Sequence, residues 1–204
     1  MTFQTFKCQL QSVLEAVMAN PLLHSHWLNT LSYWENCGAR KLSACQHPTK
    51  VKEEMLKHAA EEFRHAHYLK QQQKRLGAAD LPDYRLSSLL GGIRTYQYLD
   101  RLDIAICRIL LEKGYEQRDR GALGYLLITY AIERRAEEVY SLYHDALKHT
   151  RSPVRVQSIL LEEKEHLAEI TEELSDWPEA APLCEKACKS EAYLFNLVMA
   201  MFIV

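Results

Sequence analysis

Few residues in this chain of 204 interrupt helical structure, since it contains only seven glycines and six prolines. So low a content of turn-forming residues disfavours a sandwich or barrel of short strands, which needs frequent turns. The six cysteines include no C-x-x-C pair, which argues against a zinc ribbon or a thioredoxin-like motif. The net charge of −2 gives no electrostatic reason to expect a nucleic-acid partner.

The sequence also has little that suggests a membrane. We see no signal peptide at the N-terminus and therefore expect a reduced, cytoplasmic protein. The apolar stretch 195–204 is too short to span a bilayer. We interpret it as the end of a packing helix or as a contact in an oligomer, such as a homodimer.

Helical periodicity, in contrast, runs through almost the whole chain. Hydrophobic residues make up 48% and charged residues 25%, as in a globular domain, and we predict one domain over 1–204. Pro48 and Pro153 are expected at first helical positions, the latter after Ser152 as N-cap, and Gly77 as a stop. The expected helices are 3–19, 22–44, 48–76, 86–114, 121–148, 153–174 and 181–204. They form two long hairpins joined by a crossover helix, which Gly91 and Gly92 weaken.

Two Glu-x-x-His pairs are the main candidates for chemistry: Glu62 with His65 and Glu163 with His166. Residues three apart project from the same face of a helix, so each pair can offer a carboxylate and an imidazole to one metal ion. Apolar residues share the face of each pair, and a carboxylate there is costly unless it is paired or bound to metal. Both pairs are therefore predicted metal ligands.

Two single glutamates complete the pattern. Glu35 lies 27 residues before Glu62, and Glu133 lies 30 residues before Glu163. Both spacings fit a helical hairpin in which the single glutamate meets the Glu-x-x-His pair at a similar depth. Glu137, one turn from Glu133, also points roughly inward, so it remains an alternative or additional ligand.

The ordered set of Glu35, Glu62-x-x-His65, Glu133 and Glu163-x-x-His166 resembles the motif of the ferritin-like di-iron carboxylate superfamily. The resemblance covers about 22–175. It implies an all-α, ferritin-like four-helix bundle with a long helical crossover and extra N- and C-terminal helices, the last over about 181–204. It also implies two iron ions, with manganese as the alternative, held by Glu35, Glu62, His65, Glu133, Glu163 and His166.

The resemblance implies an oxidoreductase, and we expect a di-iron monooxygenase or oxidase. Its partners would be dioxygen, a small organic substrate and, for an oxygenase, an electron donor. No catalytic residue beyond the metal ligands and no membrane span are expected. A ferroxidase or iron-storage protein is one alternative. A non-catalytic helical interaction protein, in which the glutamates and histidines are only structural, is the other.

The remaining polar candidates are interpreted as structural. Tyr130 and Tyr140 are expected to pack in the core near Glu133. Five histidines lack a glutamate at the fitting offset and are predicted to be surface or capping residues, with His58 the best spare ligand: His24, His26, His58, His67 and His144.

Overall fold

The computed structural model describes residues 3–202, and within this range it contains α-helices and one short 3-10 helix but no strand. The prediction of an all-α chain is confirmed. The elements are α1 (Lys7–Ala19), α2 (Pro21–Cys45), α3 (Glu53–Leu76), η1 (Leu86–Ser88), α4 (Ile93–Glu112), α5 (Gln117–His149), α6 (Gln157–Ser175) and α7 (Ala180–Met199).

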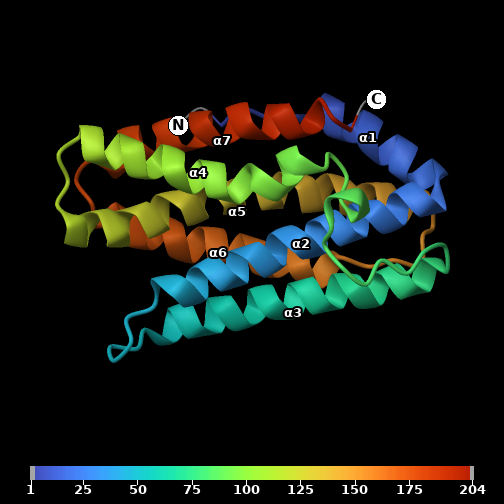
Figure 1. Cartoon of the computed structure of the whole chain (residues 1–204), viewed down its shortest axis with the longest axis horizontal. Coiled ribbons are helices and arrows are strands. Elements are labelled where there is room, and N and C mark those ends of the chain that lie inside the picture. The colour runs from blue at the N-terminus through green and yellow to red at the C-terminus, as the bar shows by residue number, and fades with distance from the viewer. Residues whose placement is uncertain (1–2, 203–204) are drawn as a thin grey trace.

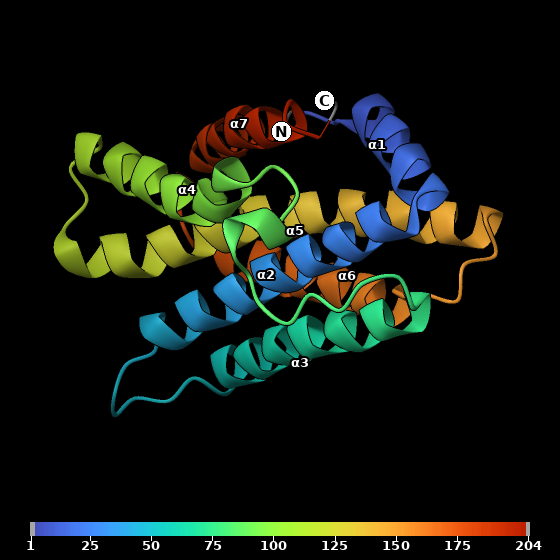
Figure 2. The same cartoon turned by 45° about the vertical axis from the view of Figure 1, so that its right-hand side comes forward.

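Two long hairpins, α2–α3 and α5–α6, form the body of the structure. Figures 1 and 2 show α4 and α7 together on one side of α5, with α2 and α3 on the other side. Helix α1 packs against α5 and α2. The long helices have one apolar stripe each, and burial of these stripes against one another is the main source of their stability.

The first part of the crossover between the two hairpins, before α4 begins, is mostly not helical. Gly77 ends α3 in the left-handed conformation, with φ of 61°, as predicted. The following chain runs back across α2 (Figure 2), where the side-chain amide of Asn29 donates to the backbone oxygens of Asp83 and Ser88. The predicted helix 86–114 is wrong in its first part, because Gly91 and Gly92 adopt positive φ and α4 begins only at Ile93.

The predicted start of the second long helix at Pro48 is also wrong, since α3 begins at Glu53. The ring of His47 accepts hydrogen bonds from the backbone N–H groups of Thr49 and Lys50, at 3.2 and 3.1 Å. These bonds hold the segment after Pro48 in a turn, an alternative to helical hydrogen bonding.

The start of α6 is displaced for a different reason. Ser152 and Pro153 do not begin it, because α6 starts at Gln157. Val154 and Val156 are fully buried in a non-helical segment before α6, and the hydroxyl of Ser152 accepts from the N–H of Val154. Burial of two β-branched side chains therefore outweighs the N-terminal helix signal.

Two other helix starts differ from the prediction. Helix α5 begins at Gln117, so Gly121 and Gly124 lie inside it rather than marking its entry. Gly124 faces α4, where an added Cβ would lie 3.6 Å from Leu110, in ordinary van der Waals contact. Helix α1 begins at Lys7, because the backbone N–H of Phe6 is instead bonded to the carboxylate of Glu138.

A buried ion pair joins α5 to α7. Arg135 of α5 contacts Glu191 of α7 at 2.8 Å, and both side chains are almost completely buried. The hydroxyl of Tyr98 in α4 donates to the same carboxylate at 2.6 Å. Phenylalanine rings, including Phe6 and Phe195, surround the guanidinium group at 4.5–4.7 Å. Glu191 therefore connects three helices.

None of the helices in the described part of the chain is long and apolar enough to cross a membrane.

Removal of the Glu191 carboxylate should strongly destabilise the packing of α4, α5 and α7. Glu191→Ala leaves the buried Arg135 without its main partner, and loss of one member of a buried pair costs about 3–5 kcal/mol. Since Arg135 keeps its contact with Glu138, we expect a loss near ~3 kcal/mol in urea unfolding. The matched control is Glu169→Ala, which removes an exposed pair with Lys57 and should cost less than about 1 kcal/mol. Equal losses in both variants would contradict this role for Glu191.

Candidate metal centre

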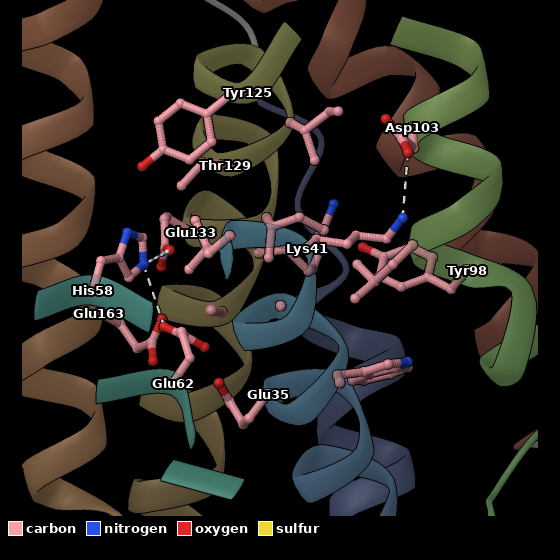
Figure 3. Close-up of a pocket in the computed structure, with 18 of the residues that line it drawn as sticks. Glu35, Lys41, His58, Glu62, Tyr98, Asp103, Tyr125, Thr129, Glu133 and Glu163 are labelled. Atoms are coloured by element: carbon pink, nitrogen blue, oxygen red, sulfur yellow. Dashed lines mark hydrogen bonds and ion pairs between the residues drawn. The ribbon is translucent and has the colours of Figure 1, made fainter. Parts of the chain in front are cut away.

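Four helices each contribute one carboxylate to a single buried cluster. These are Glu35 of α2, Glu62 of α3, Glu133 of α5 and Glu163 of α6, all buried. Figure 3 shows Glu62, Glu133 and Glu163 pointing toward one another around His58. His65 and His166 follow Glu62 and Glu163 by three residues on the same helix faces, and they reach the cluster as well. The structure thus brings together all six residues selected from the sequence.

The cluster contains two groups of side chains that can hold a metal ion. The first group consists of Glu35, Glu62, His65 and Glu163, with one possible ligand atom from each within 4.8 Å of the others. His65 Nδ1 lies 3.1 Å from Glu163 Oε1 and 3.8 Å from Glu35 Oε2. Three carboxylates and one imidazole therefore face a common point.

The second group consists of His58, Glu62, Glu133 and His166, again within 4.8 Å of one another. His166 Nδ1 lies 3.5 Å from Glu62 Oε1 and 3.9 Å from Glu133 Oε1. Glu62 belongs to both groups, so its carboxylate can bridge two ions. Both groups combine carboxylate oxygen and imidazole nitrogen donors, which suit metal ions such as iron and manganese.

Each Glu-x-x-His histidine is oriented from outside by a carboxylate of the facing helix. His65 Nε2 lies 2.6 Å from Glu162, and His166 Nε2 lies 2.9 Å from Glu61. Both contacts leave Nδ1 directed into the cluster. A carboxylate on the outer nitrogen fixes the orientation of a metal-ligating histidine and makes it a better donor.

Buried polar atoms of the cluster that lack a hydrogen bond show whether a metal ion fits the site. Buried polar atoms in proteins are normally hydrogen-bonded. Among residues 3–202, five of the few atoms that make no hydrogen bond lie in the cluster and belong to the predicted ligands: Glu62 Oε1, His65 Nδ1, Glu133 Oε2, Glu163 Oε1 and His166 Nδ1. Of these, His65 Nδ1 and Glu163 Oε1 lie within ion-pair distance of each other. Cations placed between these atoms would satisfy them, so the donor set fits bound metal ions.

The pKa values of the carboxyl groups reflect the same crowding. Burial, together with Glu35 and Glu163, raises the pKa of Glu62 well above its ordinary value. Burial, together with Glu133 and Glu35, does the same for Glu163. Burial also raises the pKa of Glu133 to about 7. For Glu35, burial is outweighed by hydrogen bonding, chiefly with His65, and its pKa is lowered. Without metal, the cluster retains protons that cations would displace.

The two Glu-x-x-His histidines differ in their protonation. Burial opposes the charge of His65, but Glu163 and Glu35 raise its pKa to about 12. Burial lowers the pKa of His166 to about 3. In the metal-free protein the His65 ring is therefore protonated on both nitrogens and positively charged, whereas the His166 ring is neutral. A metal ion at the first group must displace the proton of His65, since imidazole binds metals in its neutral form.

His58 corrects a prediction from the sequence. It was expected at the surface or at a helix end, but it is buried, with Nε2 3.1 Å from Glu133 Oε1 and 3.3 Å from Glu62 Oε1. Its position four residues before Glu62 places it on the same helix face, which was the available signal. His24 is also buried rather than exposed, and lies 2.5 Å from the hydroxyl of Tyr143, away from the cluster.

Glu137 and Tyr140 lie in α5, the helix that contributes Glu133. Glu137 is half-buried and belongs to neither ligand group, whereas Glu133 belongs to the second. Tyr140 is buried as expected, and its hydroxyl also donates a hydrogen bond to Glu35. Packing and support of a carboxylate are thus combined in one side chain.

A cavity of about 310 Å³ adjoins the cluster. Glu35, Glu62 and Glu133 lie at one end of it, and the ion pair between Lys41 and Asp103 lies at the other (Figure 3). The walls between the two ends are mainly apolar and aromatic, and include Leu31, Trp34, Leu42, Leu99, Ile128 and Ile132.

Comparisons with protein families, with curated proteins and with solved structures found no match to this chain.

Stability of the metal-free protein should fall as the pH rises from 6.5 to 8. The pKa of Glu133 is raised from an ordinary 4.5 to about 7, so the folded state binds more protons than the unfolded state in this range. Glu62, Glu163 and His65 have raised pKa values and act in the same direction. The lowered pKa values of His166 and His24 oppose this mainly at and below their ordinary value of 6.5, where the unfolded state binds more protons at these rings. Melting of chelated protein by circular dichroism measures the effect.

Metal-loaded protein supplies the comparison for this experiment. Because metal binding requires the deprotonated ligands, the increase in melting temperature on adding Mn²⁺ or anaerobic Fe²⁺ should grow over the same pH range. A metal-free protein whose melting temperature rises from pH 6.5 to 8 would contradict the assignment of these pKa shifts.

Glu133 and Glu137 should respond differently to the same substitution. Glu133→Gln removes a charge from the second group and should lower the iron content by about one ion per chain. Glu137→Gln, as the matched control, should retain the full iron content, because Glu137 lies outside both groups. Elemental analysis after anaerobic loading measures both variants. Iron loss in Glu137→Gln alone would show that the ligand has been placed one turn too early.

Proposed function

We propose that this protein is a ferritin-like, non-haem di-iron oxidase or monooxygenase that uses dioxygen to oxidise a small, largely apolar organic molecule. Four carboxylates with imidazoles form a hard donor set that suits iron or manganese better than metals that prefer thiolates. Four negative charges would balance two divalent ions, which makes their burial tolerable.

The apolar cavity is the observation that carries the choice of an organic substrate. Its walls are mainly hydrocarbon, and its inner end reaches Glu35, Glu62 and Glu133. A concave apolar pocket with a few polar groups at one point is typical of a small-molecule site. A hydrated cation would find few oxygen ligands along such walls, so the cavity favours an organic molecule over Fe²⁺ as the substrate.

The side chains have separate tasks in this proposal. Two iron ions, when bound, would supply the electrons that reduce dioxygen. Glu162 and Glu61 hold His65 and His166 in place from outside. Tyr140 hydrogen-bonds Glu35 and limits its movement. Walls such as Leu99 and Ile132 exclude water and orient the substrate beside the carboxylates.

Oxygen uptake by iron-loaded protein tests the proposal. An oxygenase consumes one dioxygen per substrate and two external electrons, placing one oxygen atom in the product and releasing the other as water. Uptake with a chemical reductant should therefore rise when an apolar substrate is added, and the product should contain label from ¹⁸O₂. An oxidase would form a dehydrogenated product without label. Uptake that follows added Fe²⁺ alone would instead indicate a ferroxidase, and protein that binds no iron would exclude both.

A larger side chain in the cavity should block the organic substrate without removing metal. Ala136 lines the cavity but belongs to neither ligand group, so Ala136→Leu fills part of the space. We expect a tenfold or greater drop in substrate-stimulated uptake, in line with the roughly 10–200-fold effect of small changes in pocket volume. Iron content should stay unchanged.

Ala60→Leu is the control, because Ala60 is exposed on α3. It makes the same substitution outside the cavity and should leave the uptake unaltered. If Ala136→Leu retains full activity on every substrate that the wild type oxidises, the cavity is not the substrate site.

A further inference from the structure

We infer that His58 is a third imidazole ligand, which makes the two metal positions chemically unequal. This inference rests on the proposed metal centre and adds a residue outside the set predicted from the sequence. His58 belongs to the second group together with Glu62, Glu133 and His166. The first group contains His65 as its single imidazole.

The position of His58 is that of a ligand rather than of a packing residue. Its Nε2 lies 3.1 Å from Glu133 Oε1 and 3.3 Å from Glu62 Oε1, between two carboxylates that also face His166 Nδ1. The rings of His58 and His166 lie side by side, with centroids 3.9 Å apart. Two buried imidazoles are thus directed at one pair of carboxylates.

The direction in which the His58 ring points supports its role as a ligand. His58 lines the apolar cavity together with the carboxylates, whereas His65 and His166 do not. In Figure 3 its ring points from α3 toward Glu133 and Glu62 at the inner end of the cavity. His58 is therefore the one imidazole of the three that a molecule in the cavity can approach.

Unequal donor sets should give unequal metal affinities. The first group offers three carboxylates and one imidazole, and the second offers two of each, with Glu62 common to both. Imidazole suits ions such as Fe²⁺ and Co²⁺, while carboxylate-rich sites suit Mn²⁺. Filling should then occur in two steps, and the step that belongs to the second group should depend on His58.

Titration of the metal-free full-length protein with Co²⁺ tests this dependence by visible absorption and calorimetry. His58→Gln keeps an N–H that can donate to Glu133 but removes the ring nitrogen. Since loss of a partner outside the ligand shell already weakens metal binding about 10–100-fold, we expect a loss of about 100-fold or more in one step. The other step should change less than about twofold. Glu35→Gln should have the opposite selectivity, because Glu35 belongs only to the first group.

His67→Gln is the matched control, since His67 is exposed on the same helix. It should leave both steps unchanged. Wild-type affinity for two Co²⁺ in His58→Gln would overturn the inference while leaving the metal centre in place. Wild-type protein that binds no Co²⁺, Mn²⁺ or Fe²⁺ would overturn the metal centre itself.

X-ray absorption of Co²⁺-loaded wild-type protein provides a measurement that does not depend on a variant folding. Three imidazoles shared between two ions support His58 as a ligand. Two imidazoles shared between two ions overturn it.

Discussion

The burial of four glutamates in one cluster is the constraint on which the rest of the structure depends. An ionised carboxylate removed from water costs several kcal/mol unless opposite charges or hydrogen bonds replace the lost solvation. The protein supplies part of this compensation, through the proton of His65 and the hydroxyl of Tyr140. Oxygens of Glu62 and Glu133 still lack a hydrogen bond. Two divalent ions would carry the positive charge that is still missing, which is why we favour a metal centre over a purely structural cluster.

Long helices meet this constraint because they fix side chains at regular intervals on rigid backbones. The ligands come from four helices, so each carboxylate is held by a different element and the cluster cannot form until the hairpins pack. A buried ion pair outside the cluster stabilises the packing of the neighbouring helices α4, α5 and α7. Arg135 and Glu191 join α5 to α7 beside Tyr98 and Phe195, and three of these four side chains, Arg135, Tyr98 and Phe195, line the cavity. The ion pair therefore stabilises the wall of the cavity as well as the packing of the helices.

The helical class and the six clustered residues could be read from the sequence because both depend on periodicity. Glu62 and His65 share a face wherever the helix begins, so an error of five residues at its start did not matter. The start itself was not predictable from Pro48, since the His47 ring competes for the backbone. Val154 and Val156 show the same limit, because only tertiary burial explains why their segment is not helical. His58 was predicted only as a spare ligand because no glutamate lies three residues before it.

The cavity gives the cluster two different sides. Its inner end meets Glu35, Glu62, Glu133, Glu163 and His58, whereas His65 and His166 lie behind and are held by Glu162 and Glu61. Carboxylates can change between terminal and bridging positions, but an imidazole fixed through both nitrogens cannot. The rigid ligands His65 and His166 would thus anchor the ions from behind, and the adjustable carboxylates, with His58 beside them, would face the cavity in which the proposed substrate binds. In the proposed enzyme, the apolar walls would shield this side of the cluster from bulk water, so that an oxidising centre held there would act on the substrate rather than on solvent.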